Sequence, residues 1–503
     1  MKPASTLAAV LLAAGVVLAL SAPRAQAPQA GDEPLRPRIH FTPPRYFMND
    51  PNGLVYYKGE YHLFYQHNPF GEEWGHMSWG HAVSRDMLHW QHLPVALSEE
   101  GGVMIFSGSA VVDSRNSSGL CHADAADPSC LIAIYSGDGL GKETQNIAFS
   151  NDRGRTWTKY RGNPIIDLGR KDFRDPKVFW HAPTGRWIMA TVLAGEHKVR
   201  FFGSNDLIKW ETLSDFGPAG ATGGAWECPD LFELSVEPSN ERRWVLVVNI
   251  NPGGVAGGSG TQYFVGAFDG VTFTNENASA RTLWADYGKD FYASQSFSDI
   301  PAADGRRIWM GWISNWAYAN AEPTVRWRGA QSIPRTLALE RSSDGVRLVQ
   351  RPIDELRDLR VGEAAVVAGS SALPPSAEIE LTLTRSDGPV GLRIFNEAGE
   401  EVTIGATSSP SEVFIDRQRS SAGPAFHADY PGRHAGPAQW KDGKLSLRIV
   451  FDRSVMEVFA ADGTTVLTER AYPTRQFDRL ELHPPGRTGG ATARLWELRS
   501  SMP

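Results

Sequence analysis

The stretch Ser150-Asn151-Asp152-Arg153-Gly154-Arg155-Thr156-Trp157 follows an apolar, strand-like run and ends on a tryptophan. Ser, Asn, Asp and Gly favour tight turns, so the stretch predicts a hairpin turn that closes on an aromatic side chain. Related turns occur at Ser84-Arg85-Asp86 before Trp90, Ser204-Asn205-Asp206 before Trp210 and Phe268-Asp269-Gly270 before Phe273. Recurrence of one turn chemistry along the chain indicates a repeated structural unit.

Paired strand-like runs surround these turns and repeat five times. The second runs of the pairs are Tyr61–Tyr65, Leu131–Tyr135, Trp187–Val192, Trp244–Asn249 and Ile308–Ile313. The first runs are Gly53–Tyr57, Ser109–Val112, Lys177–Trp180, Leu231–Leu234 and Ala293–Phe297. Five units of several short antiparallel strands predict a five-bladed β-propeller, which we place at residues 36–338.

A different pattern follows the repeats. Residues 339–361 form a linker in which Pro352–Leu356 predicts a short helical connector. From Gly362 the chain alternates apolar and polar residues between Gly, Asp and Pro turns, which predicts an antiparallel β-sandwich over 362–503. The whole chain is therefore expected to be all-β. Asp452 and Glu457 are the sandwich carboxylates that most resemble catalytic groups, and we expect both on solvated faces, in an accessory domain without an acid or base.

Composition limits the function. The 503 residues carry a formal charge of −7, so no basic field attracts nucleic acid. The 16 Trp, 23 Phe and 13 Tyr provide flat faces that can stack on sugars as well as fill cores. Residues 1–27 combine a basic start, an apolar run and a small-residue cleavage site, which predicts a signal peptide and a secreted or periplasmic protein without membrane insertion. A monomer is favoured.

The three cysteines and the early histidines allow several interpretations. Cys121 and Cys130 are nine residues apart around a polar loop, and whether they form a disulfide stays open. Cys228 is left over, and a packing role is favoured over a nucleophile. The histidines between His62 and His92 match no metal-binding spacing, so we expect no metal and no cofactor.

Three carboxylates begin inner strands of the predicted blades. Asp50 opens the first blade, Asp175 the third and Glu227 the fourth. Because the first strand of each blade lines the central channel, these side chains are expected to converge at one mouth, where burial without a partner would be costly. Asp50 is expected to stay ionised if Asn52 and local amides donate hydrogen bonds to it. Two differently tuned carboxyl groups can cleave a glycosidic bond.

The motifs around these acids are Met48-Asn49-Asp50-Pro51-Asn52-Gly53, Phe173-Arg174-Asp175-Pro176 and Trp226-Glu227-Cys228-Pro229-Asp230. Together with the stretches at 66–70, 74–81, 106–109, 290–295 and 327–335, they resemble glycoside hydrolase family 32, the invertase, inulinase and levanase group. The likeness covers nearly the whole mature chain. It implies a secreted, retaining and exo-acting enzyme that releases terminal β-D-fructose from levan or inulin and also cleaves sucrose.

The resemblance also implies residue roles. Asp50 is the implied nucleophile, Glu227 the general acid and base, and Asp175 the group that holds substrate hydroxyls and stabilises the transition state. The residues implied for the fructose pocket are Asn49, Gln66, Trp74, Phe106, Ser107, Arg174 and Trp312.

Three alternatives stay open. A sucrose-preferring invertase would share these motifs. A sialidase would share the turn at 150–157, which is a scaffold feature, but would need an arginine cluster and a tyrosine nucleophile that we cannot assign. A sugar-binding propeller would use the aromatics and acids without catalysis. Release of free fructose separates a fructosidase from a sialidase or a lectin.

Overall fold

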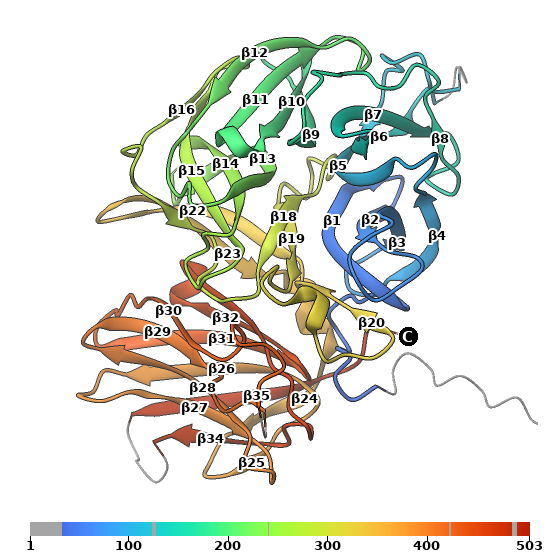
Figure 1. Cartoon of the computed structure of the whole chain (residues 1–503). Coiled ribbons are helices and arrows are strands. Elements are labelled where there is room, and N and C mark those ends of the chain that lie inside the picture. Colours follow the sequence, from blue (N-terminus) through green and yellow to red (C-terminus); the bar gives the residue numbers. More distant parts are fainter. Residues whose placement is uncertain (1–32, 123–126, 240, 422–423, 485–489, 503) are drawn as a thin grey trace, which may run out of the picture.

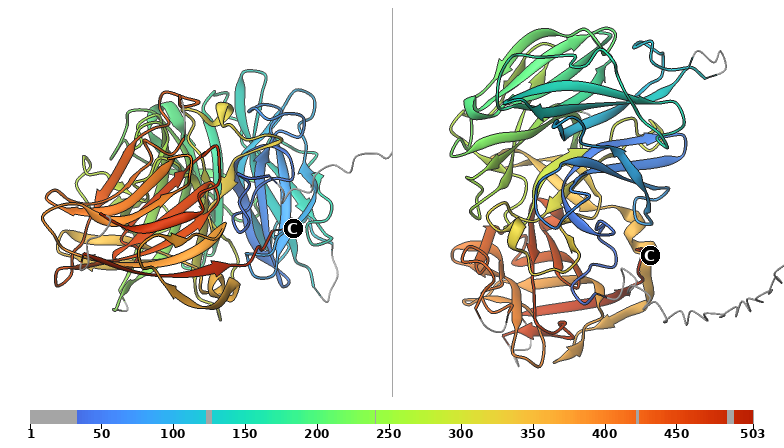
Figure 2. Two further views of the ribbon diagram at one scale, coloured as in Figure 1. Left: turned by 90° about the horizontal axis from the view of Figure 1, so that it is seen from below. Right: turned by 45° about the vertical axis from the view of Figure 1, so that its right-hand side comes forward.

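The structure is a computed structural model, and it describes residues 33–122, 127–239, 241–421, 424–484 and 490–502. The described chain is all-β, as predicted, with short 3-10 helices at η2 (Ala194–Glu196), η3 (Ala319–Ala321), η4 (Asp354–Leu359) and η5 (Ala461–Gly463). Its strands form two bodies side by side, one from blue to yellow and the other in orange and red (Figures 1 and 2). In the part that the structure describes, no helix has the length and apolarity to cross a membrane.

The first body contains five groups of antiparallel strands. The first group is β1 (Tyr46–Tyr57), β2 (Glu60–His67), β3 (Ser78–Ser84) and β4 (Gln91–Leu97), with β20 (Trp327–Arg328) beside β1. The second is β5 (Met104–Asp113), β6 (Cys130–Gly139), β7 (Lys142–Ser150) and β8 (Thr158–Lys159). The third is β9 (Phe173–His181), β10 (Arg186–Leu193), β11 (Lys198–Ser204) and β12 (Glu211–Phe216).

The fourth and fifth groups share one ten-stranded sheet. The fourth is β13 (Ala225–Glu237), β14 (Arg242–Asn251), β15 (Gly260–Phe268), β16 (Phe273–Asn275) and β17 (Leu283–Trp284). The fifth is β18 (Tyr292–Ser296), β19 (Arg307–Ile313), β21 (Ala330–Gln331), β22 (Arg335–Ser342) and β23 (Gly345–Pro352). A parallel pairing of β13 with β22 joins the two groups.

The first strands of the five groups form a closed ring of neighbours. β1 contacts β5, β5 contacts β9, β9 contacts β13, β13 contacts β18, and β18 contacts β1. Each of the five predicted second runs lies in the second strand of its group, at β2, β6, β10, β14 and β19. The predicted turns also form, because the Asp86, Asp206 and Asp269 carboxylates each accept hydrogen bonds from two backbone N–H groups that follow them.

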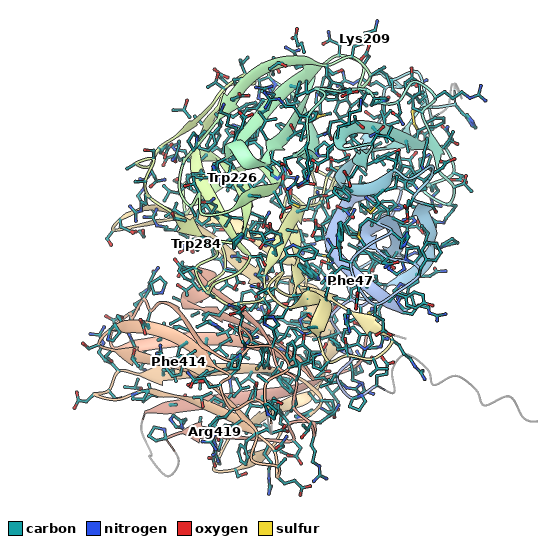
Figure 3. The ribbon with its side chains drawn as sticks, viewed as in Figure 1. Phe47, Lys209, Trp226, Trp284, Phe414 and Arg419 are labelled. Carbon is teal, nitrogen blue, oxygen red and sulfur yellow. A yellow bond between two sulfur atoms is a disulfide. The ribbon has the colours of Figure 1, made fainter. Side chains whose placement is uncertain are left out.

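The second body consists of two six-stranded sheets around one shared hydrophobic core. One sheet is β24 (Arg360–Val366), β35 (Ala491–Leu498), β26 (Ser376–Thr384), β31 (Lys444–Asp452), β32 (Val455–Ala460) and β33 (Thr465–Arg470). The other is β25 (Ser371–Ala372), β34 (Arg479–His483), β27 (Val390–Phe395), β28 (Glu401–Ser408), β29 (Ser411–Asp416) and β30 (Arg433–Pro437). Figure 3 marks Phe414 within this body and Trp226 within the first. The predicted connector forms as η4.

The expectation that Asp452 and Glu457 face solvent is wrong. Both side chains are fully buried where the two bodies meet. His40 lies between them, with Nδ1 2.9 Å from Asp452 Oδ2 and Nε2 2.9 Å from Glu457 Oε1. Arg335 also donates to Glu457, so the two carboxylates bind the second body to the first. Alternating patterns place such residues on the outer face of a sheet, but that face here is covered by the neighbouring body.

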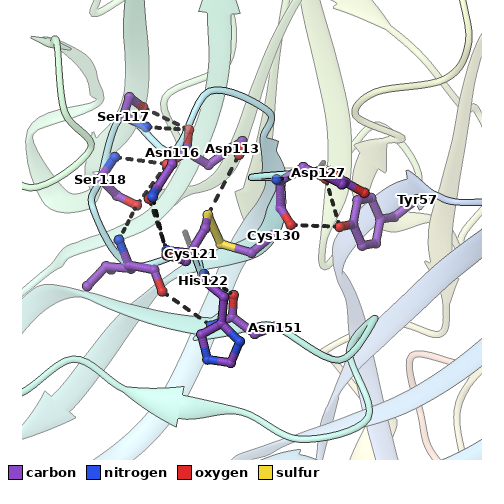
Figure 4. The surroundings of a disulfide bond; sticks show 12 residues. Tyr57, Asp113, Asn116, Ser117, Ser118, Cys121, His122, Asp127, Cys130 and Asn151 are labelled. Carbon is purple, nitrogen blue, oxygen red and sulfur yellow. Dashed lines mark hydrogen bonds between the residues drawn. A yellow bond between two sulfur atoms is a disulfide. The ribbon is translucent and has the colours of Figure 1, made fainter. Parts of the chain in front are cut away.

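Cys121 and Cys130 form a disulfide with a Cα–Cα distance of 5.3 Å. It closes the loop before β6, and Figure 4 shows the polar network beside it. In that network, the Asp113 carboxylate accepts hydrogen bonds from the backbone and hydroxyl groups of Ser117 and Ser118. The pairing that the sequence left open is therefore made.

Candidate active site

Each inner strand of the ring bulges near its start. On β13 the three steps from Glu227 to Asp230 face only two steps on β14. Equivalent irregularities lie on β1 between Met48 and Pro51, on β5 between Ile105 and Gly108, on β9 between Arg174 and Lys177, and on β18 between Tyr292 and Gln295. Because an additional residue breaks the alternation of a strand and redirects its side chain, these bulges define where functional groups can point into the ring.

The prolines of the three motifs fit these bulges. Pro51, Pro176 and Pro229 follow Asp50, Asp175 and Cys228, and proline is tolerated in a sheet where no ladder hydrogen bond is needed. Asp175 has φ 63° and Cys228 has φ 44°, in the left-handed region that non-glycine residues seldom adopt. Strain of this kind is typical of functional sites. The local sequence thus breaks the regular strand geometry at the three motifs and redirects the acidic side chains.

Asp50 is held by its neighbours in the ring. Ser107 Oγ donates to Asp50 Oδ2 at 2.6 Å, and Asn49 Nδ2 donates to Oδ1 at 2.9 Å. Asn52 does not contribute as expected: its Oδ1 accepts a hydrogen bond from the backbone N–H of Gly108, and its Nδ2 has no hydrogen-bond partner among the described residues. The pKa of Asp50 is raised overall. Burial is the largest cause, the charge of Glu227 adds to it, and the hydrogen bond from Ser107 partly opposes it.

Cys228 links Asp50 to Asp175. Its backbone N–H donates to Asp175 Oδ2 at 2.8 Å, while its Sγ lies 3.6 Å from that oxygen and 3.4 Å from Asp50 Oδ2. The thiol is buried, and burial with the adjacent carboxylates raises its pKa well above the usual range. Cys228 therefore stays a neutral thiol that donates weakly, in agreement with a packing role rather than a nucleophile.

Asp175 retains a proton more readily than a solvent-exposed aspartate. Burial is the largest influence on its pKa, Arg174 opposes it, and the charges of Glu227 and Asp50 add to it, which together raise the pKa to about 8. Three carboxyl groups in one buried cluster cannot all be ionised at low cost. The cluster therefore holds a proton at neutral pH.

Glu227 comes from the next strand of the ring and is the most accessible of the three acids, with its side chain 22% exposed. Arg174 Nη2 donates to Glu227 Oε1 at 3.2 Å, and the hydroxyl of Tyr292 donates to Oε2. Arg174 is itself held by Glu143 at 3.0 Å and Asp172 at 3.1 Å. Both Glu227 oxygens thus have a fixed donor, which sets the orientation of the carboxyl group.

The predicted pocket residues divide into three sets. Trp74 and Phe106 make an edge-to-face contact, with ring centroids 6.0 Å apart, and Trp74 is 41% exposed. Gln66 is buried and donates to the backbone of Ile105 at 3.0 Å. Trp312 has no exposed surface and packs behind Tyr292. Asn49, Ser107 and Arg174 contact the acids directly, whereas Gln66 and Trp312 lie one layer further from solvent.

Two residues of the site were not selected from the sequence. Tyr292 was noted only as part of the start of the fifth inner strand, yet it contacts Glu227. Cys228 was interpreted as a packing residue, and in addition its Sγ lies within 3.6 Å of a carboxylate oxygen of both Asp50 and Asp175. Tyr292 opens the bulge of β18 as Glu227 opens the bulge of β13, and this equivalence was a signal that could have identified it.

Cleavage of a glycosidic bond requires a pair of carboxyl groups at one site, and Asp50 and Glu227 provide such a pair. Two family models cover the chain: the Glycosyl hydrolases family 32 N-terminal domain matches residues 40–352, and the Glycosyl hydrolases family 32 C terminal matches residues 354–497. The chain belongs to glycoside hydrolase family 32. This assignment excludes the alternative that the chain is a sialidase.

Relatives agree with the family assignment. The chain is 47% identical over 472 residues to a levanase of Bacillus subtilis (strain 168), covering 90% of this chain and 68% of the levanase. It is 36% identical over 511 residues to an extracellular exo-inulinase of Aspergillus awamori, covering 92% and 93%.

Two solved structures match most of the chain. The crystal structure of exo-inulinase from Aspergillus awamori has a TM-score of 0.88 at 34% identity and covers 93% of this chain and 99% of that one. The β-fructofuranosidase from Schwanniomyces occidentalis, complexed with fructosyl-erythritol, has a TM-score of 0.85 at 32% identity and covers 94% and 99%.

Proposed function

We propose that this chain is a secreted, exo-acting β-fructosidase that releases terminal β-D-fructose from levan or inulin and also cleaves sucrose. One observation carries the proposal: Asp50 and Glu227 reach one site from different inner strands, and each carboxyl group is oriented by its own set of donors. The levanase and exo-inulinase among the relatives support this substrate class.

The proposed architecture is a five-bladed β-propeller over residues 36–338, a linker over 339–361 and a β-sandwich over 362–503. The closed ring of inner strands, with one group of strands outside each, supports five blades. The shared core of the two six-stranded sheets supports the sandwich.

Secretion is part of the proposal. The expected signal peptide, residues 1–27, lies outside the described residues. The disulfide between Cys121 and Cys130 suits an oxidising compartment, and the exo-inulinase relative is named as extracellular.

The proposed first step forms a fructosyl enzyme. Asp50 attacks the anomeric carbon, and the bond from that carbon to the glycosidic oxygen breaks as Glu227 transfers its proton to this oxygen. Burial and the fixed hydrogen bonds from Asn49 and Ser107 hold Asp50 in one orientation. The leaving group is glucose from sucrose, or the shortened fructan.

The proposed second step restores the enzyme. Glu227, now ionised, takes a proton from water, and the resulting hydroxide attacks the anomeric carbon and displaces Asp50. Arg174 and Tyr292 donate to the Glu227 carboxylate, so they stabilise the form that acts as a base. Two displacements at one carbon retain its configuration.

Asp175 is proposed to bind ring hydroxyls rather than to attack. Its Oδ2 is already occupied by the backbone N–H of Cys228, and the raised pKa favours a carboxyl group that both donates and accepts.

The proposed fructose pocket uses Trp74 and Phe106 as walls, because these rings reach solvent beside Ser107. Trp312, fully buried, is proposed to support Tyr292 instead of touching the sugar. A pocket closed by packed inner strands accepts a chain end, which gives exo action.

The test is fructose release from sucrose, inulin and levan by the purified chain and by Asp50→Asn. We expect release by the wild-type chain and none by Asp50→Asn, with an unchanged circular dichroism spectrum. Asp206→Asn, which makes the same substitution in an outer hairpin turn, is the control and should keep full activity. Near-normal turnover of Asp50→Asn would refute the assignment.

A further inference from the structure

A second cavity, of about 520 Å³, opens at the opposite end of the inner strands from the acids. Along β9 its lining begins at Lys177 and extends through Phe179 to His181, whereas Asp175 lies nearer the start of the strand. Two residue steps separate Asp175 from Lys177 and four separate it from Phe179, and each step of a regular strand spans about 3.3 Å. Small-molecule sites in proteins have volumes of this order.

Buried polar side chains separate this cavity from the active site. Lys177 Nζ donates to the backbone oxygen of Ser296 and lies 3.4 Å from Asp230 Oδ2. Gln295 donates to the backbone oxygen of Gly108 at 3.0 Å, and Ser109 donates to that of Pro176 at 2.8 Å. These contacts fill the ring between its two ends, so a ligand in the cavity does not reach the acids.

Half-buried tryptophans supply flat apolar surface to the cavity. Trp180 and Trp244 both line it. The Arg115 guanidinium lies 4.3 Å from the centre of the Trp180 ring, and Trp187 packs edge-on against that ring at 5.3 Å. Neither the Trp180 nor the Trp244 indole nitrogen has a hydrogen-bond partner among the described residues. Trp244 is likewise packed by Phe268 at 5.3 Å. Each tryptophan therefore offers the cavity the part of its ring that these neighbours leave exposed, together with a free indole donor.

The charged groups of the cavity are balanced and partly unpaired. Arg307 donates through Nη1 to the backbone oxygen of Phe297 at 3.1 Å, and its guanidinium lies over the Phe232 ring at 5.5 Å. Its other guanidinium nitrogens have no hydrogen-bond partner within the described chain. Asp299 accepts one hydrogen bond, from the backbone N–H of Val112 at 2.8 Å. The six charged residues of the lining are Lys177, Arg242 and Arg307 against Glu233, Asp269 and Asp299.

We propose that this cavity is a second carbohydrate-binding site, which takes one or two units of a short neutral oligosaccharide without cleaving it. The lining holds equal numbers of cationic and anionic side chains. A bound ion would add a net charge to the cavity that these side chains do not compensate, so a neutral ligand is favoured. Hydroxyl groups both donate and accept, so they match Arg307, Asp299 and the indole nitrogens, while a sugar face stacks on tryptophan. That the sugar is a fructo-oligosaccharide rests on the proposed function.

The experiment follows indole N–H resonances of the full chain while 1-kestose is added to the Asp50→Asn variant, which cannot consume the sugar. Signals of Trp74, Trp180 and Trp496 are assigned by their loss in Trp→Phe variants. Trp74 reports the proposed active site, and Trp180 reports the second cavity. Trp496 is the matched control, because it is also half-buried beneath an arginine, Arg360, but lies in the second body.

We expect the Trp180 indole signal to shift and saturate as 1-kestose is added, while the chemical shift of the Trp496 signal does not change. When Arg307→Gln is combined with Asp50→Asn, the apparent dissociation constant from the Trp180 signal should rise at least fivefold, and the constant from the Trp74 signal should not change. A Trp180 signal that does not move, or one that Arg307→Gln does not affect, would overturn the proposal. The Trp74 response tests the active site separately, so failure of one site is distinguishable from failure of the other.

Discussion

Arg417, which follows β29, donates a hydrogen bond to the carboxylate of Asp290, and both side chains are fully buried between the two bodies. Asp290 lies two residues before Tyr292, the donor to Glu227. The backbone N–H of Asp290 also donates to the Thr468 oxygen of β33 at 3.1 Å. The second body therefore holds the segment that presents Tyr292 to the acid.

Replacement of Arg417 by Met is expected to lower kcat/KM for sucrose about tenfold, equivalent to ~1.4 kcal/mol of transition-state stabilisation. The physical reason is that Tyr292 loses its fixed position, so Glu227 loses one of its two oriented donors. Steady-state kinetics with sucrose measure this loss.

The control for Arg417→Met is Asp452→Asn. Asp452 also joins the two bodies while fully buried, but it binds the segment at Arg38 to His40. This variant should lower the thermal midpoint and keep sucrose turnover within a few-fold. Equal losses of kcat/KM in the two variants would show that Arg417 acts only through stability.

Glu227→Gln is expected to lower kcat for sucrose by ~10²–10⁴-fold, the contribution of a general acid. The loss should be smaller in formation of the fructosyl enzyme from a fructosyl fluoride, because fluoride leaves without a proton. Azide, which needs no base, should then restore turnover and yield fructosyl azide. An equal loss on both substrates, with no rescue by azide, would remove Glu227 from the acid and base role.

Exo action is expected from the enclosed position of Asp50. Chromatography of an early inulin or levan digest should show free fructose beside nearly full-length polymer, because only a chain end enters the pocket. A ladder of oligosaccharides with little fructose would instead indicate an open cleft.

The stability of the chain should depend on pH through His40. Burial lowers its pKa, but hydrogen bonds and charges from Asp452 and Glu457 outweigh burial and raise it from 6.5 to about 9. The folded protein therefore keeps a proton that the unfolded chain releases. The stabilisation is complete below pH 6.5 and is lost as pH rises through 9, up to about 3 kcal/mol.

The His40→Gln variant isolates this effect. Between pH 6.5 and 9 the thermal midpoint of the wild-type chain should fall more steeply than that of the variant. Parallel curves would mean that His40 does not exchange a proton on unfolding.

Local patterns were sufficient to predict the strands. The second runs, such as Tyr61–Tyr65, and the turns around Asp86 and Asp206 depend on neighbours in sequence, and the structure confirms them. The Asp-Pro pairs at Asp50 and Asp175 also carry local information, because proline marks the bulges that redirect the acids.

Contacts between distant segments could not be predicted in this way. Tyr292 reaches Glu227 across 65 positions of sequence, and His40 reaches Glu457 across 417. Burial of Asp452 follows only from the packing of the second body on the first, which no alternating pattern records.

The central claim is a double displacement through Asp50, and transfer to methanol tests it most directly. Methanol added during sucrose hydrolysis captures the fructosyl enzyme as a methyl fructofuranoside, whose configuration, unlike that of free fructose, does not interconvert in water. NMR of this product should show the β anomer, the configuration of the substrate. The α anomer would contradict a covalent intermediate on Asp50.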